Sequence, residues 1–105
     1  MYDVTKLPNR IGIGFKGEKR FRKIEIDMTK WDIPDGVPAI VYLKPEGTVP
    51  YRPTVTYTDH ILTWVVDADD VNVMGEGFMQ VEMKSADIAA KSQVVSVTIN
   101  NALTR

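Results

Sequence analysis

The chain contains no cysteine, so disulfide bonds, thiolate metal sites and cysteine nucleophiles are excluded. It has a single histidine, His60, which leaves no second imidazole for a histidine-based metal site and no obvious nucleophile to activate. No apolar run approaches the roughly 20 residues that cross a bilayer, and the first residues lack the apolar core of a secretory signal. We therefore expect a soluble chain that neither binds a membrane nor leaves the cell by the secretory route.

Neither sign of charge dominates, since 13 basic and 14 acidic side chains leave a formal net charge of −1. This balance argues against nucleic acid or an anionic membrane as the partner. The 105 residues are 44% apolar and 26% charged, which is ordinary for a globular domain with one core. We expect a single domain over 1–105, with an extended lead-in over 1–9.

Apolar residues recur with a period of two in several short segments, and no long segment has the helical period. This predicts about seven strands, which lie at 11–15, 21–28, 39–44, 54–58, 61–66, 78–84 and 91–100. Turn formers separate them at intervals of roughly 8 to 12 residues, which is typical of an all-β, immunoglobulin-like antiparallel β-sandwich. The strand at 39–44 is apolar on both faces, so we expect it in the middle of a sheet.

In the strand at 11–15 the period of two puts Ile11, Ile13 and Phe15 on one face. Gly12 and Gly14 leave the other face bare, which suits a bulge or the close approach of another backbone. Between the strands at 54–58 and 61–66, Asp59-His60 is predicted to form a tight hairpin turn with His60 as a surface residue at its tip.

The core is expected to form around the two tryptophans. Trp64 shares a strand face with Leu62, and Trp31, which lies on a connection, is predicted to fold back and cover one end of the core. Val41 and Val81 are the remaining predicted core anchors.

Two patterns look like functional motifs but favour structural roles. Residues 12–17 have the letters G-x-G-x-x-G, yet the glycines fall inside a predicted strand that another strand follows, so a dinucleotide site is rejected. Asp67, Asp69 and Asp70 have carboxylates that suit a hard cation, but the further oxygen ligands of a calcium loop are not in register. Turn and helix-cap roles are favoured for them, and we expect no polar cleft, catalytic residue, metal or cofactor there.

A basic segment over 16–23 contains lysines and arginines next to Phe15 and Phe21. Aromatic and basic side chains together can bind single-stranded nucleic acid. Glu18, Glu25 and Asp27 interrupt the pattern, so a solvated strand face is the favoured interpretation.

The final predicted strand is rich in β-branched residues, carries little charge and lacks proline. At an open sheet edge such a strand pairs with other chains unless something covers it. We predict Val95, Val97 and Ile99 as an interface edge through which the domain self-associates or docks on another protein.

A series of segments in a fixed order resembles a known family. The segments are Ile26-Asp27-Met28-Thr29-Lys30-Trp31, Ile40-Val41-Tyr42-Leu43-Lys44-Pro45-Glu46-Gly47 with Pro50-Tyr51, Leu62-Thr63-Trp64-Val65-Val66, Ala68-Asp69, Gly75-Glu76-Gly77, Gln80-Val81-Glu82 and Lys91-Ser92. Together they look like the small β-sandwich module of phage and prophage tail proteins of Gram-positive hosts. They resemble the N-terminal domain of the baseplate upper protein, over most of the chain.

The resemblance implies a β-sandwich with a structural role in the virion and no catalytic residues. It implies packing roles for Trp31 and Trp64, a hairpin turn at 45–47, and backbone breaks at Gly75 and Gly77. Baseplate upper proteins continue into a region that holds receptor-binding subunits, whereas this sequence ends soon after its last strand, so we expect an attachment, spacer or decorating module. The expected location is the tail or baseplate of a virion, after synthesis in the bacterial cytoplasm. The expected partners are other tail proteins and, as a homo-oligomer, copies of the chain itself.

Two other functions stay open. A sandwich that binds carbohydrate or a host surface needs exposed aromatic side chains on one rim, and Trp31, Tyr51 and Tyr57 are the candidates. An enzyme is the third reading, and no pair of acid and base residues is brought together by sequence spacing.

Overall fold

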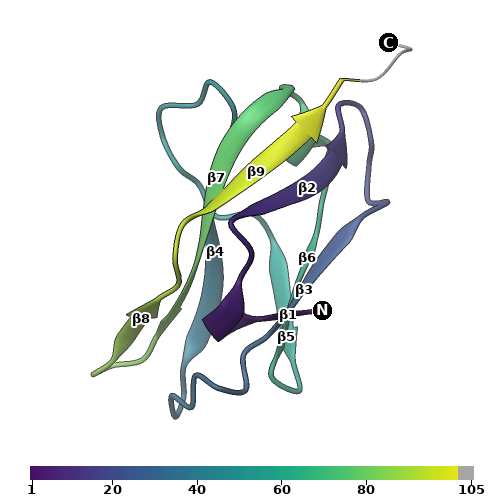
Figure 1. Cartoon of the computed structure of the whole chain (residues 1–105). Coiled ribbons are helices and arrows are strands. Elements are labelled where there is room, and N and C mark those ends of the chain that lie inside the picture. The colour runs from purple at the N-terminus through teal and green to yellow at the C-terminus, as the bar shows by residue number, and fades with distance from the viewer. Residues whose placement is uncertain (102–105) are drawn as a thin grey trace.

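The computed structural model describes residues 1–101, which form two packed β-sheets (Figure 1). In chain order the elements are β1 (Tyr2–Asp3), the 3-10 helix η1 (Val4–Lys6), β2 (Arg10–Phe15), β3 (Lys23–Asp27), β4 (Val37–Leu43), β5 (Val55–Thr58), β6 (Ile61–Val65), the 3-10 helix η2 (Ala68–Val71), β7 (Gly75–Lys84), β8 (Ala89–Lys91) and β9 (Val95–Asn100). Sheet A has the order β1-β3-β6-β5, and sheet B the order β2-β9-β7-β4 with β8 beside β7. The predicted all-β sandwich is confirmed, and the strand orders match the ABED and CFG sheets of an immunoglobulin domain.

Two strand pairs are parallel, which corrects the predicted wholly antiparallel arrangement. β1 pairs with β3 and β2 pairs with β9 in parallel, whereas the remaining ladders are antiparallel. The parallel pairs arise because the first 15 residues cross between the layers, giving β1 to sheet A and β2 to sheet B. Val4 and Leu7 are buried at this crossing, so residues 1–9 belong to the packed domain rather than to an extended lead-in.

A β-bulge interrupts β2, as its glycines led us to expect. The register against β9 shifts between Gly12 and Gly14, and Gly14 has a φ of 123° that an L side chain rarely adopts. Ile11 and Ile13 are buried, but Phe15 is 41% exposed. The extra residue changes the phase of the strand, so the predicted apolar face of three residues is reduced to two.

β4 lies at the edge of sheet B and not in its middle. Its full ladder is with β7, and on its other side an isolated bridge joins Tyr42 to Tyr51. Ile40 and Tyr42 face inward and are fully buried, whereas Val41 is only half-buried on the outer face of the sheet. Val41 is therefore not the core anchor that we predicted, because one face of this strand meets solvent.

β9 is an interior strand, so the predicted interface edge is wrong. Figure 1 shows β9, in yellow, running between β2 in purple and β7 in green, and both neighbours form hydrogen-bonded ladders with it. Val95, Val97 and Ile99 are at most 2% exposed and pack in the core. Local composition alone suggested an edge strand; pairing with the distant N-terminal strand removed that edge.

The other predicted anchors lie where expected. Trp64, Leu62 and Val81 are fully buried, and Trp31 is partly buried against the core. Gly75 and Gly77, which the family resemblance placed at backbone breaks, begin the long strand β7, and of the two only Gly75 has a positive φ, at 125°. A Cβ on Gly77 would collide with the Leu43 carbonyl, so close contact with β4 explains this glycine.

The hairpin of β5 and β6 has the predicted two-residue turn. Asp59 and His60 both have positive φ, at 54° and 63°, which is the geometry of a type I′ turn. The turn leaves His60 exposed, and its carbonyl accepts a hydrogen bond of 2.8 Å from the Met28 N–H. The single histidine is therefore a surface turn residue, as predicted.

Candidate interaction surfaces

The carboxylate of Asp70 is the centre of a buried polar cluster. Its Oδ2 accepts hydrogen bonds from the Trp64 indole N–H at 3.0 Å and from the Asp67 backbone N–H at 2.9 Å. Its Oδ1 accepts from the Tyr51 hydroxyl at 2.5 Å, and its backbone carbonyl accepts from the Tyr42 hydroxyl at 2.9 Å. Asp70 is only 6% exposed, so these bonds replace the water that its charge would otherwise need.

Two members of the acidic triplet, Asp67 and Asp70, cap η2, which confirms for them the role favoured from the sequence. Asp67 is the N-cap residue, its Oδ1 accepts from the Ala68 N–H at 2.8 Å, and Asp70 completes a capping box. A hollow of about 210 Å³ adjoins the turn and includes Asp69 in its lining, so polar side chains do line a hollow at this place. Since the Asp70 carboxylate already accepts three hydrogen bonds within the protein, it is committed to structure.

Two aromatic rings pack against this cluster. The ring centroid of Tyr42 lies 5.1 Å from that of Trp64 and 5.6 Å from that of Tyr51. Burial and the hydrogen bond to Asp70 raise the pKa of the Tyr51 hydroxyl, and burial followed by the charge of Asp70 raises that of Tyr42. Both hydroxyls therefore stay protonated donors over the physiological pH range.

The three candidate glycan-binding aromatics divide into two places. Trp31 and Tyr57 line one hollow of about 280 Å³ together with His60, Asp32 and Asp35. Tyr51 lies elsewhere and is held by Asp70. The structure thus brings two of the three predicted aromatic side chains to one rim and adds polar side chains that the sequence did not associate with them.

The basic segment is organised around Arg22. Its guanidinium carbon lies 5.7 Å from the ring centroid of Phe15 and 5.5 Å from that of Phe21, and its Nε donates to Glu18 at 2.9 Å. Phe21 remains 75% exposed. Because Glu18 holds the central arginine, the segment offers less free positive charge than its composition suggests.

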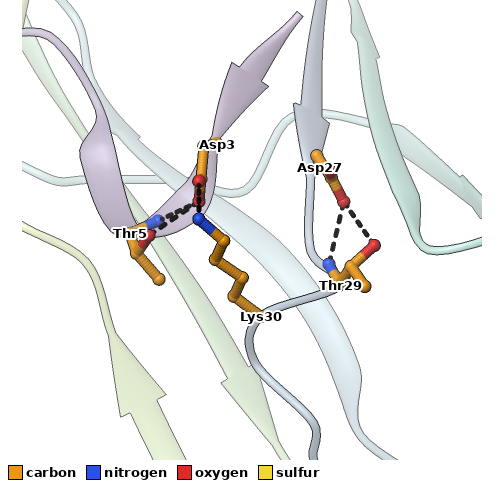
Figure 2. Close-up of polar contacts among 5 residues, drawn as sticks. All are labelled: Asp3, Thr5, Asp27, Thr29 and Lys30. Atoms are coloured by element: carbon orange, nitrogen blue, oxygen red, sulfur yellow. Dashed lines mark hydrogen bonds and ion pairs between the residues drawn. The ribbon is translucent and has the colours of Figure 1, made fainter.

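A pair of identical turns joins the N-terminus to sheet A (Figure 2). Asp3 and Asp27 are register partners in β1 and β3, and each accepts hydrogen bonds from the N–H and hydroxyl of the threonine two residues later. Lys30 also donates to Asp3 at 2.8 Å. The repeated sequence D-x-T-K at 3–6 and 27–30 carries this arrangement, and it was a signal that our sequence analysis missed.

Hydrogen bonding lowers the pKa of both carboxyl groups. The Lys30 ammonium and the Thr5 donors hold the pKa of Asp3 well below its ordinary range. The two Thr29 donors lower the pKa of Asp27, although the neighbouring charge of Asp3 opposes them. The two turns are thus strongest when both aspartates are ionised.

Within residues 1–101 five strands lie at sheet edges, and four of them carry protective features. β8, which pairs with β7 alone, has only three residues, among them Lys91. β1 has only two residues, β2 contains the bulge, and β4 contains Pro38, which has no N–H to donate. β5 has the sequence Val-Thr-Tyr-Thr, with no charge, proline or glycine, and pairs within residues 1–101 with β6 alone. It is the edge strand with least protection against pairing with another chain.

The free backbone groups of β5 belong to Val55 and Tyr57. Residues flanking a two-residue turn exchange hydrogen bonds, so Thr58 bonds to Ile61 and Thr56 to Thr63. Hydrogen bonds at the two ends of β6 support this alternation. His60 and Val66, the even-numbered residues that flank β6, form backbone hydrogen bonds on the side of β3. The N–H and C=O groups of Val55 and Tyr57 therefore point away from β6. We call these groups the β5 edge.

Among residues 1–101 no helix has the length and hydropathy of a membrane span, and no three histidine or acidic side chains gather closely enough to hold a metal ion. No protein-family model matches the chain, and no curated protein matches it. The geometry of these surfaces is therefore the main guide to function.

Proposed function

We propose that this chain is a non-enzymatic structural module of a phage or prophage tail or baseplate, which acts through contacts with other proteins. The observation that carries the protein-contact part is the β5 edge, whose strand is uncharged and lacks proline. A strand of that composition binds a further strand through main-chain hydrogen bonds. The assignment to a tail is supported by the ordered landmarks between Ile26 and Ser92.

The test is incorporation into particles. In the source organism, an epitope tag is added after Arg105. Released phage particles are then purified and labelled with a gold-conjugated antibody against the tag. We expect the chain to co-purify with intact particles and the label to lie on the tail. A chain that is expressed but absent from particles would contradict the proposal.

A second candidate function is glycan binding in the hollow lined by Trp31 and Tyr57. Aromatic rings pack against the apolar faces of sugars, and the carboxylates of Asp32 and Asp35 are acceptors for sugar hydroxyls. The hollow unites these groups on one rim, which is the specific observation in favour of this function.

A glycan array tests it with Trp31→Ala and Tyr57→Ala. Loss of binding in both variants, with melting temperatures still above the assay temperature, supports a glycan site. Phe21→Ala is the matched control, because it removes an aromatic side chain that is 75% exposed in another part of the molecule. An array with no signal for the unmodified chain, or a signal that Phe21→Ala also removes, would exclude this hollow as the site.

A further inference from the structure

We propose that the β5 edge binds the β5 edge of a second copy of this chain. The two strands would run antiparallel about a twofold axis and join the two copies of sheet A into one continuous sheet. This inference deepens the proposed function, since it names one partner for a surface that we assign to protein contact.

The positions of the free groups determine the register. Only Val55 and Tyr57 direct N–H and C=O groups outward, so a hydrogen-bonded pair must place these residues opposite each other. An antiparallel pairing of Val55 with Tyr57 of the second copy uses every one of these groups. The twofold axis then passes beside Thr56, which faces Thr56 of the second copy.

The side chains suit this register. Each Val55 lies opposite a Tyr57, and a β-branched residue opposite an aromatic one is a favourable cross-strand pair. Val55 is half-buried and Tyr57 is 37% exposed, so both have apolar surface left to cover. Thr56 is exposed on the outer face, where two threonines can face each other without a clash of charge.

The charges that flank the strand are complementary under a twofold axis. Arg52 precedes the strand and Asp59 follows it, so antiparallel pairing puts the end of β5 that follows Arg52 next to the end of the second β5 that precedes Asp59. Arg52 donates to Glu82 at 2.6 Å but keeps 58% of its side chain exposed, which leaves guanidinium donors for a second carboxylate. A parallel arrangement would instead place like charges together at each end.

A second copy is therefore favoured over an unrelated strand, because the chain complements itself in hydrogen bonding, packing and charge. The contact is short, so the dimer is weak in solution and becomes important where copies are concentrated, as in an assembly.

The sharpest test uses the absence of cysteine in the chain. In the proposed register the two copies of Thr56 form a non-hydrogen-bonded pair with Cα atoms about 4.5 Å apart, a separation that a disulfide spans. Mild oxidation of Thr56→Cys should give a covalent dimer on non-reducing gels. Thr54→Cys is the register control, because its two copies would lie four residues apart along the strands, about 13 Å.

Introducing a charge at the twofold axis gives an independent readout of self-association. Thr56→Lys should weaken self-association by at least about tenfold, because two ammonium groups then face each other across the axis. An equimolar mixture of Thr56→Lys and Thr56→Glu should restore it as a heterodimer. Thr63→Lys is the matched control, since its two copies would be three strand spacings apart, about 14 Å, and largely screened.

Sedimentation equilibrium at protein concentrations from about 1 μM to about 1 mM measures the self-association of each variant. A monomer throughout this range, a Thr56→Lys variant that associates like the unmodified chain, or cross-linking of Thr54→Cys as fast as that of Thr56→Cys would each overturn the inference. None of these results bears on incorporation into particles, so a failure here is distinguishable from a failure of the proposed function.

Discussion

The indole N–H of Trp64 donates a hydrogen bond of 3.0 Å to the carboxylate of Asp70, six residues further along the chain. Trp64 is fully buried at the end of β6, and Asp70 is on the 3-10 helix that leads to β7. The bond fixes the corner where the chain passes from sheet A to sheet B. Tyr51 donates to the same carboxylate, so the connection before β5 is attached to the same point.

Asp70→Asn should destabilise the domain by about 1–3 kcal/mol, because the amide cannot accept at both positions and leaves a buried donor unpaired. Urea unfolding followed by tryptophan fluorescence measures the change. Asp69→Asn is the control: Asp69 is exposed and should change stability by less than about 0.5 kcal/mol. Equal effects at the two positions would contradict the structural role of Asp70.

Trp64→Ala should cost roughly 3 to 5 kcal/mol, since it empties a fully buried site and also removes a donor to Asp70. Trp31→Ala should cost clearly less, because Trp31 is only partly buried against the core. Differential scanning calorimetry compares the two variants. A larger loss from Trp31→Ala would mean that the end of the sandwich, and not its centre, limits stability.

The domain should lose stability in acid. The pKa values of Asp3, Asp27 and Asp67 are lowered by hydrogen bonds that favour the ionised form. A carboxyl group with a folded pKa below its unfolded value of about 3.9 stabilises the fold above that pH, and this contribution disappears as pH falls through the folded pKa. Urea unfolding measured from about pH 6 down to about pH 2 should therefore show falling stability below about pH 4.

Lys30→Met isolates the contribution of one ion pair. The Lys30 ammonium is the largest cause of the low pKa of Asp3, so the variant should move that pKa upward toward its ordinary value. A carboxyl NMR titration reads the pKa directly. The pKa of Asp27 serves as the internal reference, since the Thr29 donors, which the substitution leaves in place, are its main cause. No shift at Asp3 would show that the ion pair does not form in solution.

The turn between β5 and β6 should tolerate glycine well. His60 has a φ of 63°, and left-handed geometry costs an L side chain roughly 1–2 kcal/mol. His60→Gly relieves that cost but gives the unfolded chain more freedom. We therefore expect the free energy of unfolding, measured by thermal unfolding, to rise by about 0.5–1 kcal/mol. Thr58→Gly, in the adjoining strand, is the control and should destabilise. A loss at both positions would contradict the type I′ assignment.

Local patterns were sufficient for the elements that depend on neighbouring residues. The period of two predicted the strands around Trp64 and Val81, because alternate side chains on an extended backbone point to opposite faces. The acidic triplet predicted a cap, and Asp59-His60 predicted the hairpin turn, since both depend on local backbone geometry. Even there, the bulge in β2 turned Phe15 away from the predicted face.

Positions within the sheets could not be read in the same way. Val41 was predicted in the middle of a sheet and Val97 at an edge, whereas the structure reverses the two strands. The composition of a strand reports how apolar its surroundings are, but its neighbours are chosen by pairing between segments far apart in sequence. Arg10–Phe15 pairs with Val95–Asn100 across nearly the whole chain, and no local signal encodes that contact.

The amino-acid sequence by itself determined that this protein is a β-sandwich built around Trp64, because side-chain periodicity and turn chemistry act over a few residues. The tertiary structure alone decided which strands are open and which polar groups meet. It buried Val95–Asn100 between two neighbours, exposed the edge of Val55–Thr58, and brought Tyr51 to Asp70. These relationships depend on how the two layers pack, which is a property of the whole chain.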